Sequence, residues 1–357
     1  MKKIPVHLGD RSYDVHVGSG LLPDVGRSLA AVITPCRVAV VSDEHVAPLY
    51  GKVIEDGLRA AGYTPHRLVI PAGEDQKTLK TAERLYDGFF DAQLDRKSAA
   101  LALGGGVIGD LTGFAAATFM RGIAFVQVPT TLLAQVDASV GGKVAVNHPR
   151  GKNMIGAFHQ PRAVFADIAT LRTMPREELV SGLVEVIKHG IIRDAALFEF
   201  VESRLGDILR MDGAALEHIV ARSVEIKASV VQADEREDGL RAILNYGHTI
   251  GHAIESLTNF TCYSHGGAVA VGMCCAAKIA VGMGMLAPKD AERLEQLLGL
   301  LGLVTRPGGL DPKDIHQKLY ADKKTERGKL RLVLPTAIGR VVIRDDVPQK
   351  VILEALS

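Results

Sequence analysis

Short apolar runs alternate with amphipathic stretches over the first half of the chain. Between residues 4 and 17, apolar side chains occupy every second position on either side of Gly9-Asp10, which predicts two strands joined by a tight turn. Later apolar runs are typical of buried parallel strands, and the segments between them have helical periodicity. The predicted parallel strands are 37–41, 64–70, 98–103, 125–128 and 163–167, and the first predicted helices are 42–62 and 78–93.

Helical periodicity dominates after about residue 175, and only the tail at 330–347 has an extended pattern. Strands that alternate with helices favour a mostly parallel, Rossmann-like sheet. The sequence therefore predicts an α/β N-terminal domain at residues 1–175 and a mainly α-helical C-terminal domain at 176–357. The helical segments of the second domain are 174–194, 195–210, 213–237 and 290–303.

Composition and charge narrow the classes of partner. The chain has 357 residues, which is enough for two domains with ample core, and it contains no Trp. Its formal net charge at pH 7 is +1. A charge this small provides no bulk attraction to nucleic acid or to a membrane surface, so we expect neither as a partner. Local basic clusters remain able to bind a small anionic ligand.

Cysteine usage and the apolar runs favour a cytoplasmic protein. The four cysteines are sparse and unpatterned, and Cys274 and Cys275 are adjacent, which is typical of reduced thiols. The N-terminal residues include two lysines without the apolar core of a signal peptide. The longest apolar run, 266–286, contains Lys278 and many small residues. We expect it to form a closely packed, buried helix and not a membrane span.

A glycine-rich turn follows the predicted strand at 98–103. Gly104, Gly106 and Gly109 form G-x-G-x-x-G directly before a helical segment, 111–120. In this context the motif binds a pyrophosphate at a helix N-terminus. A tight turn that needs glycine for its backbone angles is the alternative interpretation. The motif also departs from the dinucleotide fingerprint, because it follows a later strand and no acidic residue stands about 20 positions further on.

Other polar residues extend this predicted site. Asp43 can hold the ribose in place of the missing acid, and Glu74 and Lys77 can flank the nucleotide. The segment 128–161 is long, glycine-rich and short of regular structure, and such loops are usually functional. A solvated surface explains any single lysine, but the whole group fits a ligand with phosphate or carboxylate groups. The group comprises Thr130, Thr131, Asp137, Lys143, Lys152 and Asn153, then Lys188, Lys227, Arg241, Asn245, Lys323 and Lys324.

Three histidines and one glutamate form a candidate metal set. His248 and His252 are four residues apart, which places both rings on one face of a helix, and His265 follows shortly after. Glu185 lies in a separate helical segment. Two histidines and one carboxylate form a recognised catalytic zinc set, although ordinary surface or core histidines are the alternative. The spacing does not select which of these residues bind a metal.

Six longer motifs occur in order along nearly the whole chain: GGGVIGDLTGFAAATFMRG, VPTTLLAQVDASVGGKVAVN, GKNMIGAFHQP, GLVEVIKHGII, DEREDGLRAILNYGHTIGHAIE and HGGAVAVGM. In these motifs the sequence resembles the 3-dehydroquinate synthase family of sugar-phosphate cyclases. The resemblance implies a dehydroquinate synthase-like fold, similar to that of glycerol dehydrogenase and the iron-dependent alcohol dehydrogenases.

The resemblance implies both cofactor sites. It selects Glu185, His248 and His265 as ligands of Zn²⁺ or Co²⁺ and assigns His252 to the substrate. One position departs from the family pattern, since Ala72 stands where the family commonly has Asp. The implied NAD contacts are Asp43, Ala72, Gly73, Glu74, Asp75, Gln76, Lys77, Gly106, Val107, Ile108, Gly109, Asp110, Thr130, Thr131, Lys143, Lys152, Thr170, Leu171, Arg172 and Thr173.

The resemblance also implies the reaction. The substrate is 3-deoxy-D-arabino-heptulosonate 7-phosphate, and the product of this shikimate-pathway step is 3-dehydroquinate. NAD takes a hydride and later returns it, phosphate is eliminated, and an aldol step closes the carbocycle. The implied phosphate binders are Lys152, Asn153, His252 and one of Lys323 and Lys324 (Lys324 is our choice), with Arg121 from a second subunit of a homodimer. Arg241, Asn245, Lys227 and Lys188 hold the carboxylate and ring hydroxyls, and Asp137 and Lys143 complete the catalytic set.

Three alternatives share parts of this pattern. A related cyclase that makes an aminated quinate or a cyclitol would use the same cofactors, but Arg241 with Lys227 favours a substrate that has a carboxylate. A polyol dehydrogenase would accumulate NADH and has no use for Lys152 and Asn153. A catalytically inactive NAD-binding regulator does not need an intact metal set.

Overall fold

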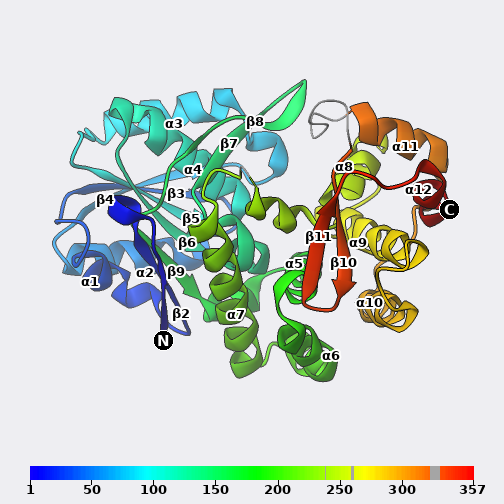
Figure 1. Ribbon diagram of the computed structural model, residues 1–357. Coiled ribbons are helices and arrows are strands. Elements are labelled where there is room, and N and C mark those ends of the chain that lie inside the picture. The colour runs from blue at the N-terminus through cyan, green and yellow to red at the C-terminus, as the bar shows by residue number, and fades with distance from the viewer. Residues whose placement is uncertain (238, 259–260, 322–329) are drawn as a thin grey trace. The chain divides into compact units, whose positions relative to one another are not determined.

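The computed structural model describes residues 1–237, 239–258, 261–321 and 330–357 (Figure 1). These residues form two compact units. The first contains Met1–Leu179 and Met211–Glu235, and the second contains Val180–Arg210 and Arg236–Ser357. This grouping differs from a single division at residue 175, because the segment with helix α7 (Gly213–Ala233) returns to the first unit and packs against its first two strands.

A seven-stranded sheet forms the centre of the first unit. The strand order is β1-β2-β9-β6-β5-β3-β4, and every neighbouring pair is parallel except the N-terminal pair β1–β2. The predicted mostly parallel sheet is therefore confirmed. The strands are β1 (Lys2–Val6), β2 (Tyr13–Gly18), β3 (Arg37–Asp43), β4 (Thr64–Ile70), β5 (Ala99–Gly104), β6 (Ala124–Pro129) and β9 (Ala163–Asp167).

Helices cover both faces of this sheet (Figure 1). Val38 and Val40 of β3 pack with α1 (Val25–Leu29) and α2 (Ala47–Ala60) on one face. Their neighbours Ala39 and Val41 pack with α3 (Leu79–Asp91) and α4 (Gly106–Thr118) on the other. Successive side chains of a strand point to opposite faces, so a strand between two helical layers is apolar throughout.

Two local expectations were wrong. The segment after β6 is more regular than expected, since it forms a π-helical turn, η5 (Ala134–Ala138), and an antiparallel hairpin of β7 (Lys143–His148) and β8 (Gly151–Phe158). The hairpin forms because Val144 and Val146, at alternate positions, are buried in the core beside α4. The helix expected at 42–62 begins only at Ala47, because Asp43 accepts hydrogen bonds from the backbone N–H groups of His45 and Val46 in a turn.

The second unit is mainly helical, as predicted, and α9 (His265–Gly282) packs against three of its helices and a hairpin. By length and composition α9 could cross a membrane, but 78% of its apolar window is buried inside the protein, as expected of a core helix. The other elements are α5 (Arg176–Arg193), α6 (Ala195–Leu209), α8 (His248–Leu257), α10 (Pro288–Leu300), α11 (Pro312–Ala321), α12 (Gln349–Leu356), the 3-10 segment η7 (Leu240–Asn245) and the hairpin β10 (Leu332–Ala337) with β11 (Arg340–Arg344).

Glycines bring α8 and α9 into close contact. A Cβ atom on Gly272 would lie 2.0 Å from the carbonyl oxygen of Gly247 and 2.9 Å from the nitrogen of Gly251. Gly247 itself has φ +80°, a left-handed conformation that favours glycine. Because α8 begins at His248 and α9 at His265, this contact helps to set the relative position of the two histidines.

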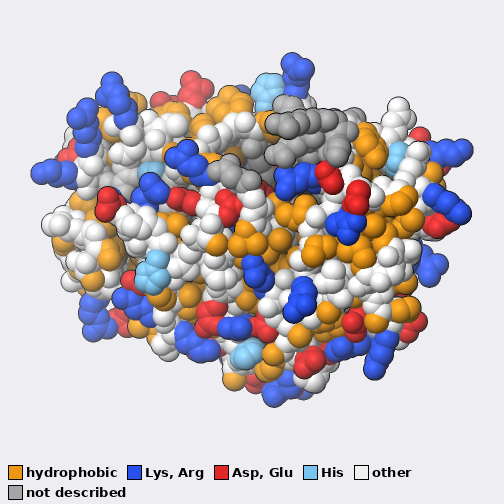
Figure 2. Space-filling model, in the orientation of Figure 1, with side chains coloured by type: hydrophobic (Ala, Val, Ile, Leu, Met, Phe, Trp, Pro, Cys, Tyr) orange, Lys and Arg blue, Asp and Glu red, His pale blue; other side chains and the backbone are white. Residues whose placement is uncertain are grey.

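Charges of both signs are mixed on the surface. Figure 2 shows Lys and Arg side chains interspersed with Asp and Glu over the face in view, which agrees with a formal net charge of +1.

Candidate functional site

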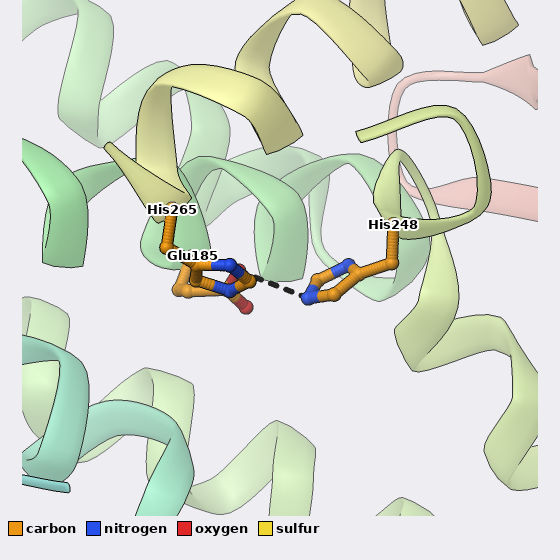
Figure 3. A group of neighbouring side chains, drawn as sticks. All are labelled: Glu185, His248 and His265. Atoms are coloured by element: carbon orange, nitrogen blue, oxygen red, sulfur yellow. Dashed lines mark ion pairs between the residues drawn. The ribbon is translucent and has the colours of Figure 1, made fainter. Parts of the chain in front are cut away.

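The structure brings together the three residues proposed as metal ligands. Glu185 lies within α5, and His248 and His265 are the first residues of α8 and α9 (Figure 3). One ligand atom from each side chain lies within 4.8 Å of the other two. The Nε2 atom of His248 is 3.6 Å from Oε1 of Glu185. A carboxylate and two imidazoles at such separations are a suitable donor set for Zn²⁺.

Glu185 is the buried anion of this cluster. Its side chain is only 1% exposed, and Oε2 forms an ion pair with Lys188, one turn further along α5. Its Oε1 atom is buried and accepts no hydrogen bond from the residues that the structure describes. A buried carboxylate oxygen without a donor is costly, so this atom fits a site for a cation.

Neighbouring oxygens hold the two histidine rings. The Nδ1–H group of His248 can donate to the carbonyl oxygen of Tyr246 at 3.2 Å. His265 Nδ1 lies 3.4 Å from Oε1 of Glu255, a buried acid of α8. An imidazole that donates through Nδ1 presents Nε2 to a metal, and such outer partners fix the tautomer and the ring orientation. Burial lowers the pKa of His265, but the hydrogen bond to Glu255 and the charges of Glu185 and Glu255 outweigh it, so the pKa is raised.

His252 remains close to both other histidines. Its ring centroid lies 5.5 Å from that of His248 and 6.1 Å from that of His265. His252, Glu255 and His265 form a second group of potential ligand atoms, also within 4.8 Å of one another. The selection of Glu185, His248 and His265 therefore stays a prediction. Sequence reasoning missed Glu255, although an acid seven residues after His248 faces the same side of a helix.

The predicted NAD residues gather at one edge of the sheet in the first unit. Parallel strands present their carboxyl ends at the same edge, and ligands of such sheets bind where the strand order reverses. Here the strand order reverses at β3, because β4 lies on one side of β3 and the next strand of the sheet, β5, lies on the other side. The predicted residues are Asp43 at the end of β3, 72–77 after β4, 106–110 at the start of α4, Thr130 and Thr131 after β6, and 170–173 in the 3-10 segment η6 (Ile168–Thr173) after β9.

A polar network connects these segments to the β7–β8 hairpin. Lys77 is 5% exposed, and its Nζ atom lies 2.5 Å from both Asp110 Oδ2 and Asn153 Oδ1. Asn147 donates to Glu74 Oε1 at 2.7 Å and accepts from the backbone of Asn153 at 3.0 Å. Burial raises the pKa of Asp110, and the ammonium group of Lys77 opposes that rise. Asn147 was missed because nothing in its local sequence distinguishes it from other polar residues of this segment.

The glycines of the G-x-G-x-x-G motif do not all have the same role, since one allows close packing and another leaves room for a ligand. A Cβ atom on Gly109 would lie 2.7 Å from Oε1 of Gln127 on β6, so this glycine allows α4 to approach the sheet. Gly106 is different, because its Cβ would meet only Ala138, at 3.6 Å. The free N–H groups at the start of α4 remain suited to a phosphate.

Lys227 and Asp137 form a pair in the first unit. Lys227 was predicted as part of the helical half, but it lies on α7, where its Nζ atom is 2.9 Å from Asp137 Oδ1 and also contacts the Asp137 backbone carbonyl. Sequence order alone does not reveal that α7 returns to the sheet. Asp137 belongs to η5, a kind of turn often found at functional sites.

The remaining predicted substrate residues are distributed over both units. Arg241 is 2% exposed in η7, and Asn245 donates to Glu237 at 2.7 Å. Lys324, with Lys323, lies outside the described residues. Lys143 and Lys152 lie on the β7–β8 hairpin, and Arg121 lies in the 3-10 turn η4 (Phe119–Arg121) with φ +67°.

Two family models match the chain. The model described as "3-dehydroquinate synthase N-terminal" matches residues 67–181, and the model described as "3-dehydroquinate synthase C-terminal" matches residues 182–325. Full-length relatives agree. The curated 3-dehydroquinate synthase of Desulforamulus reducens is 53% identical, with 100% of each chain covered. That of Pelotomaculum thermopropionicum is 50% identical, covering 100% of this chain and 96% of the relative.

Solved structures of sugar-phosphate cyclases are also similar. The 2-epi-5-epi-valiolone synthase of Streptomyces hygroscopicus subsp. jinggangensis, with NAD⁺ and Zn²⁺ bound, has a TM-score of 0.89 at 29% identity and covers 98% of this chain and 97% of its own. A 2-deoxy-scyllo-inosose synthase complexed with carbaglucose-6-phosphate, NAD⁺ and Co²⁺ has a TM-score of 0.89 at 30% identity, with 99% of each chain covered. A probable glycerol dehydrogenase from Sinorhizobium meliloti, at 16% identity and a TM-score of 0.66, shares the fold.

Proposed function

The chain belongs to the 3-dehydroquinate synthase family, and from that premise we propose which of its residues carry the reaction. The activity converts 3-deoxy-D-arabino-heptulosonate 7-phosphate into 3-dehydroquinate and phosphate, by transient oxidation with NAD, phosphate elimination, re-reduction and intramolecular aldol closure. NAD and Zn²⁺ or Co²⁺ are the cofactors. The observation that supports our assignment most directly is the donor set of Glu185, His248 and His265, with its buried Oε1 atom that accepts no hydrogen bond in the described structure.

We assign the metal to that donor set. When bound, the divalent ion supplies acidity to a substrate hydroxyl, and NAD supplies a temporary acceptor for the hydride. Tyr246 and Glu255 hold the histidine rings so that Nε2 of each is available. Glu185 supplies the negative charge, which Lys188 balances from the next turn of α5.

Fixed cations account for the anions of the substrate. Lys152, Asn153, His252 and Lys324 bind the phosphate, while Arg241, Asn245, Lys188 and Lys227 hold the carboxylate and ring hydroxyls. Support comes from burial, since Lys188, Lys227 and Arg241 are 1%, 6% and 2% exposed, respectively. Charged groups already oriented in a buried site stabilise developing charge without reorganisation. Asp137 holds Lys227 in place, and Lys143 completes the set.

We place NAD along the carboxyl edge of the sheet. The start of α4 takes the pyrophosphate, and Asp43 and Glu74 take the ribose hydroxyls. Lys77, through its bonds to Asp110 and Asn153, fixes the hairpin that carries Lys152 beside the cofactor.

A coupled turnover assay tests the activity. Incubated with the heptulosonate phosphate and catalytic NAD⁺, the zinc-loaded protein should release one phosphate per substrate without net NADH. Excess chelator should lower phosphate release by at least about 100-fold, since the metal acts on the reacting hydroxyl, and added Zn²⁺ or Co²⁺ should restore it. Net accumulation of NADH would identify a polyol dehydrogenase. Faster turnover of a hexose 6-phosphate would identify a cyclitol-forming cyclase, such as the neighbour complexed with carbaglucose-6-phosphate.

We propose a homodimer in which Arg121 acts on the partner's substrate. Support comes from the surface beside it, where Met120 is 39% exposed and Phe90 is 63% exposed, with the Phe90 ring 5.1 Å from that of Phe119. Both Met120 and Arg121 have positive φ, at 53° and 67°, an arrangement that is costly for residues other than glycine and is often retained at functional sites. A second copy of the chain would cover these apolar side chains.

Subunit mixing tests this role of Arg121. Arg121→Ala and Glu185→Gln should each be inactive alone. A hybrid dimer has one site with both native residues only if Arg121 acts across the interface, so random mixing should restore roughly one quarter of wild-type turnover. Absence of recovery, with hybrid dimers shown by sedimentation, would place Arg121 in its own subunit's site.

We further propose a cytoplasmic location. The described structure leaves Cys36, Cys262, Cys274 and Cys275 as free thiols, which suits a reducing compartment.

A further inference from the structure

The sheet of the first unit separates between β6 and β9 toward its carboxyl edge. β6 stays paired with β5 along its whole length, and β9 stays paired with β2. Within the described residues, β6 and β9 pair with each other at only two positions, the last of which is Gln127 with Val164. The last residues of the two strands, Pro129 and Asp167, therefore lie beyond the shared ladder.

The side-chain amide of Gln135 bridges this separation. Gln135 belongs to η5 and is 0% exposed. Its Nε2 group donates to the carbonyl oxygens of Pro129 at 3.1 Å and Asp167 at 3.0 Å. It also donates to Thr170 Oγ1 at 3.2 Å, while the Thr170 hydroxyl donates to the Asp167 carbonyl at 2.7 Å. All three neighbours present lone pairs to Nε2, which determines the orientation of the amide.

We propose that Gln135 is a positioning residue of the NAD site. Thr130 and Thr131 directly follow Pro129, and Thr170–Thr173 follow Asp167 after two residues. By joining the ends of β6 and β9, Gln135 fixes the spacing of these two threonine segments, so that both face one nucleotide. The inference rests on the NAD contacts proposed above and adds a residue that touches neither cofactor nor substrate.

Pre-orientation is the physical basis of the effect. Without the Gln135 amide, NAD binding has to order the two threonine segments, which the native protein already holds in place. The entropy lost in that ordering weakens the affinity for NAD. Residues that lock the partners of a binding group determine how well the group is placed. Loss of the Gln135 amide should therefore raise the dissociation constant of the cofactor and leave turnover at saturating NAD⁺ nearly unchanged.

A second contact holds only one of the two segments. The hydroxyl of Tyr50, on α2, lies 2.7 Å from Thr173 Oγ1 and donates to the Thr170 carbonyl at 3.3 Å. Tyr50→Phe thus releases the turn after β9 without touching the end of β6. It provides a graded comparison for the loss of Gln135.

NADH binding to the zinc-loaded full-length protein tests the proposal. Gln135→Met keeps the length of the side chain and removes its donors, and we expect the NADH dissociation constant to rise roughly tenfold, equivalent to one or two net hydrogen bonds. Tyr50→Phe should raise it roughly threefold. Turnover at saturating NAD⁺ should stay within about threefold for both variants. The chain has no Trp, so nicotinamide fluorescence can be followed without tryptophan emission.

Gln232→Met is the matched control. Gln232 accepts a hydrogen bond from the backbone of His7 at 3.0 Å in the same unit, next to the N-terminal strand pair. Its loss should leave the NADH dissociation constant at the wild-type value. Gln135→Asn, which keeps the amide but is too short to reach all three acceptors, serves if Gln135→Met does not fold, and should change affinity in the same direction.

The outcomes distinguish the positioning role of Gln135 from the proposed NAD site itself. A folded Gln135 variant with wild-type NADH affinity, or an equal loss in Gln232→Met, overturns the positioning role alone. A wild-type protein that binds no NADH overturns the proposed NAD site, and this inference with it.

Discussion

Glu185→Gln is expected to remove metal retention and turnover together. The substitution replaces the buried anion of the donor set by a neutral amide and removes the ion pair between Glu185 and Lys188. Replacing a residue that only hydrogen-bonds to a metal ligand lowers metal affinity about 10- to 100-fold. Replacing a ligand itself should therefore lower metal affinity at least roughly 100-fold. Zinc content after dialysis against graded chelator, and phosphate release at a fixed zinc concentration, measure the two effects.

Substitutions of two other glutamates provide comparisons for Glu185→Gln. Glu225→Gln, on α7, alters only a partly exposed residue paired with Arg222 at 2.7 Å and should retain both zinc and turnover. Glu255→Met removes the partner of His265 Nδ1, so zinc affinity should fall about 10- to 100-fold while excess zinc restores turnover. If Glu185→Gln kept wild-type zinc content and turnover, the proposed ligand set would be wrong.

Gly272→Ala is expected to destabilise the second unit and weaken metal binding through geometry alone. The added Cβ would lie 2.0 Å from the Gly247 carbonyl oxygen, so α8 and α9 have to move apart. Overpacking of this kind costs typically about 1–3 kcal/mol, and here the obstacle is backbone, which cannot rotate away. Since His248 and His265 begin the two helices, the shift should also lower zinc affinity. Thermal unfolding and chelator competition measure both effects.

Gly299→Ala is the control for that substitution. Gly299 lies in α10, and a Cβ atom there would meet nothing within 4 Å. Alanine is the better helix former by up to about 1 kcal/mol, so this variant should be at least as stable as the wild type, with unchanged zinc affinity. Equal behaviour of the two alanine variants would show that the contact between α8 and α9 does not position the histidines.

The sequence pattern was sufficient to predict those strands in which every residue is buried. β5 and β9 are buried at every position, and such apolar runs could be read directly. The β7–β8 hairpin was missed because its glycine and polar content concealed the alternation of Val144 and Val146, whose burial depends on α4. The return of α7 to the sheet has no local signal, since its helical periodicity is the same whichever unit it packs on.

The candidate site could be predicted only in part for a similar reason. The four-residue interval between His248 and His252 indicated a shared helix face, but the choice among three histidines depends on α5, which brings Glu185 from far away in the chain. Family resemblance supplied that choice. Glu255, Asn147 and Gln135 were missed because each acts through a partner distant in sequence or on another element, so no motif spacing reveals them.

Lys188 neutralises Glu185 from the same helix, so the polypeptide can fold before it acquires an ion. We therefore expect the apoprotein to be folded and to bind Zn²⁺ or Co²⁺ in a separate, later step.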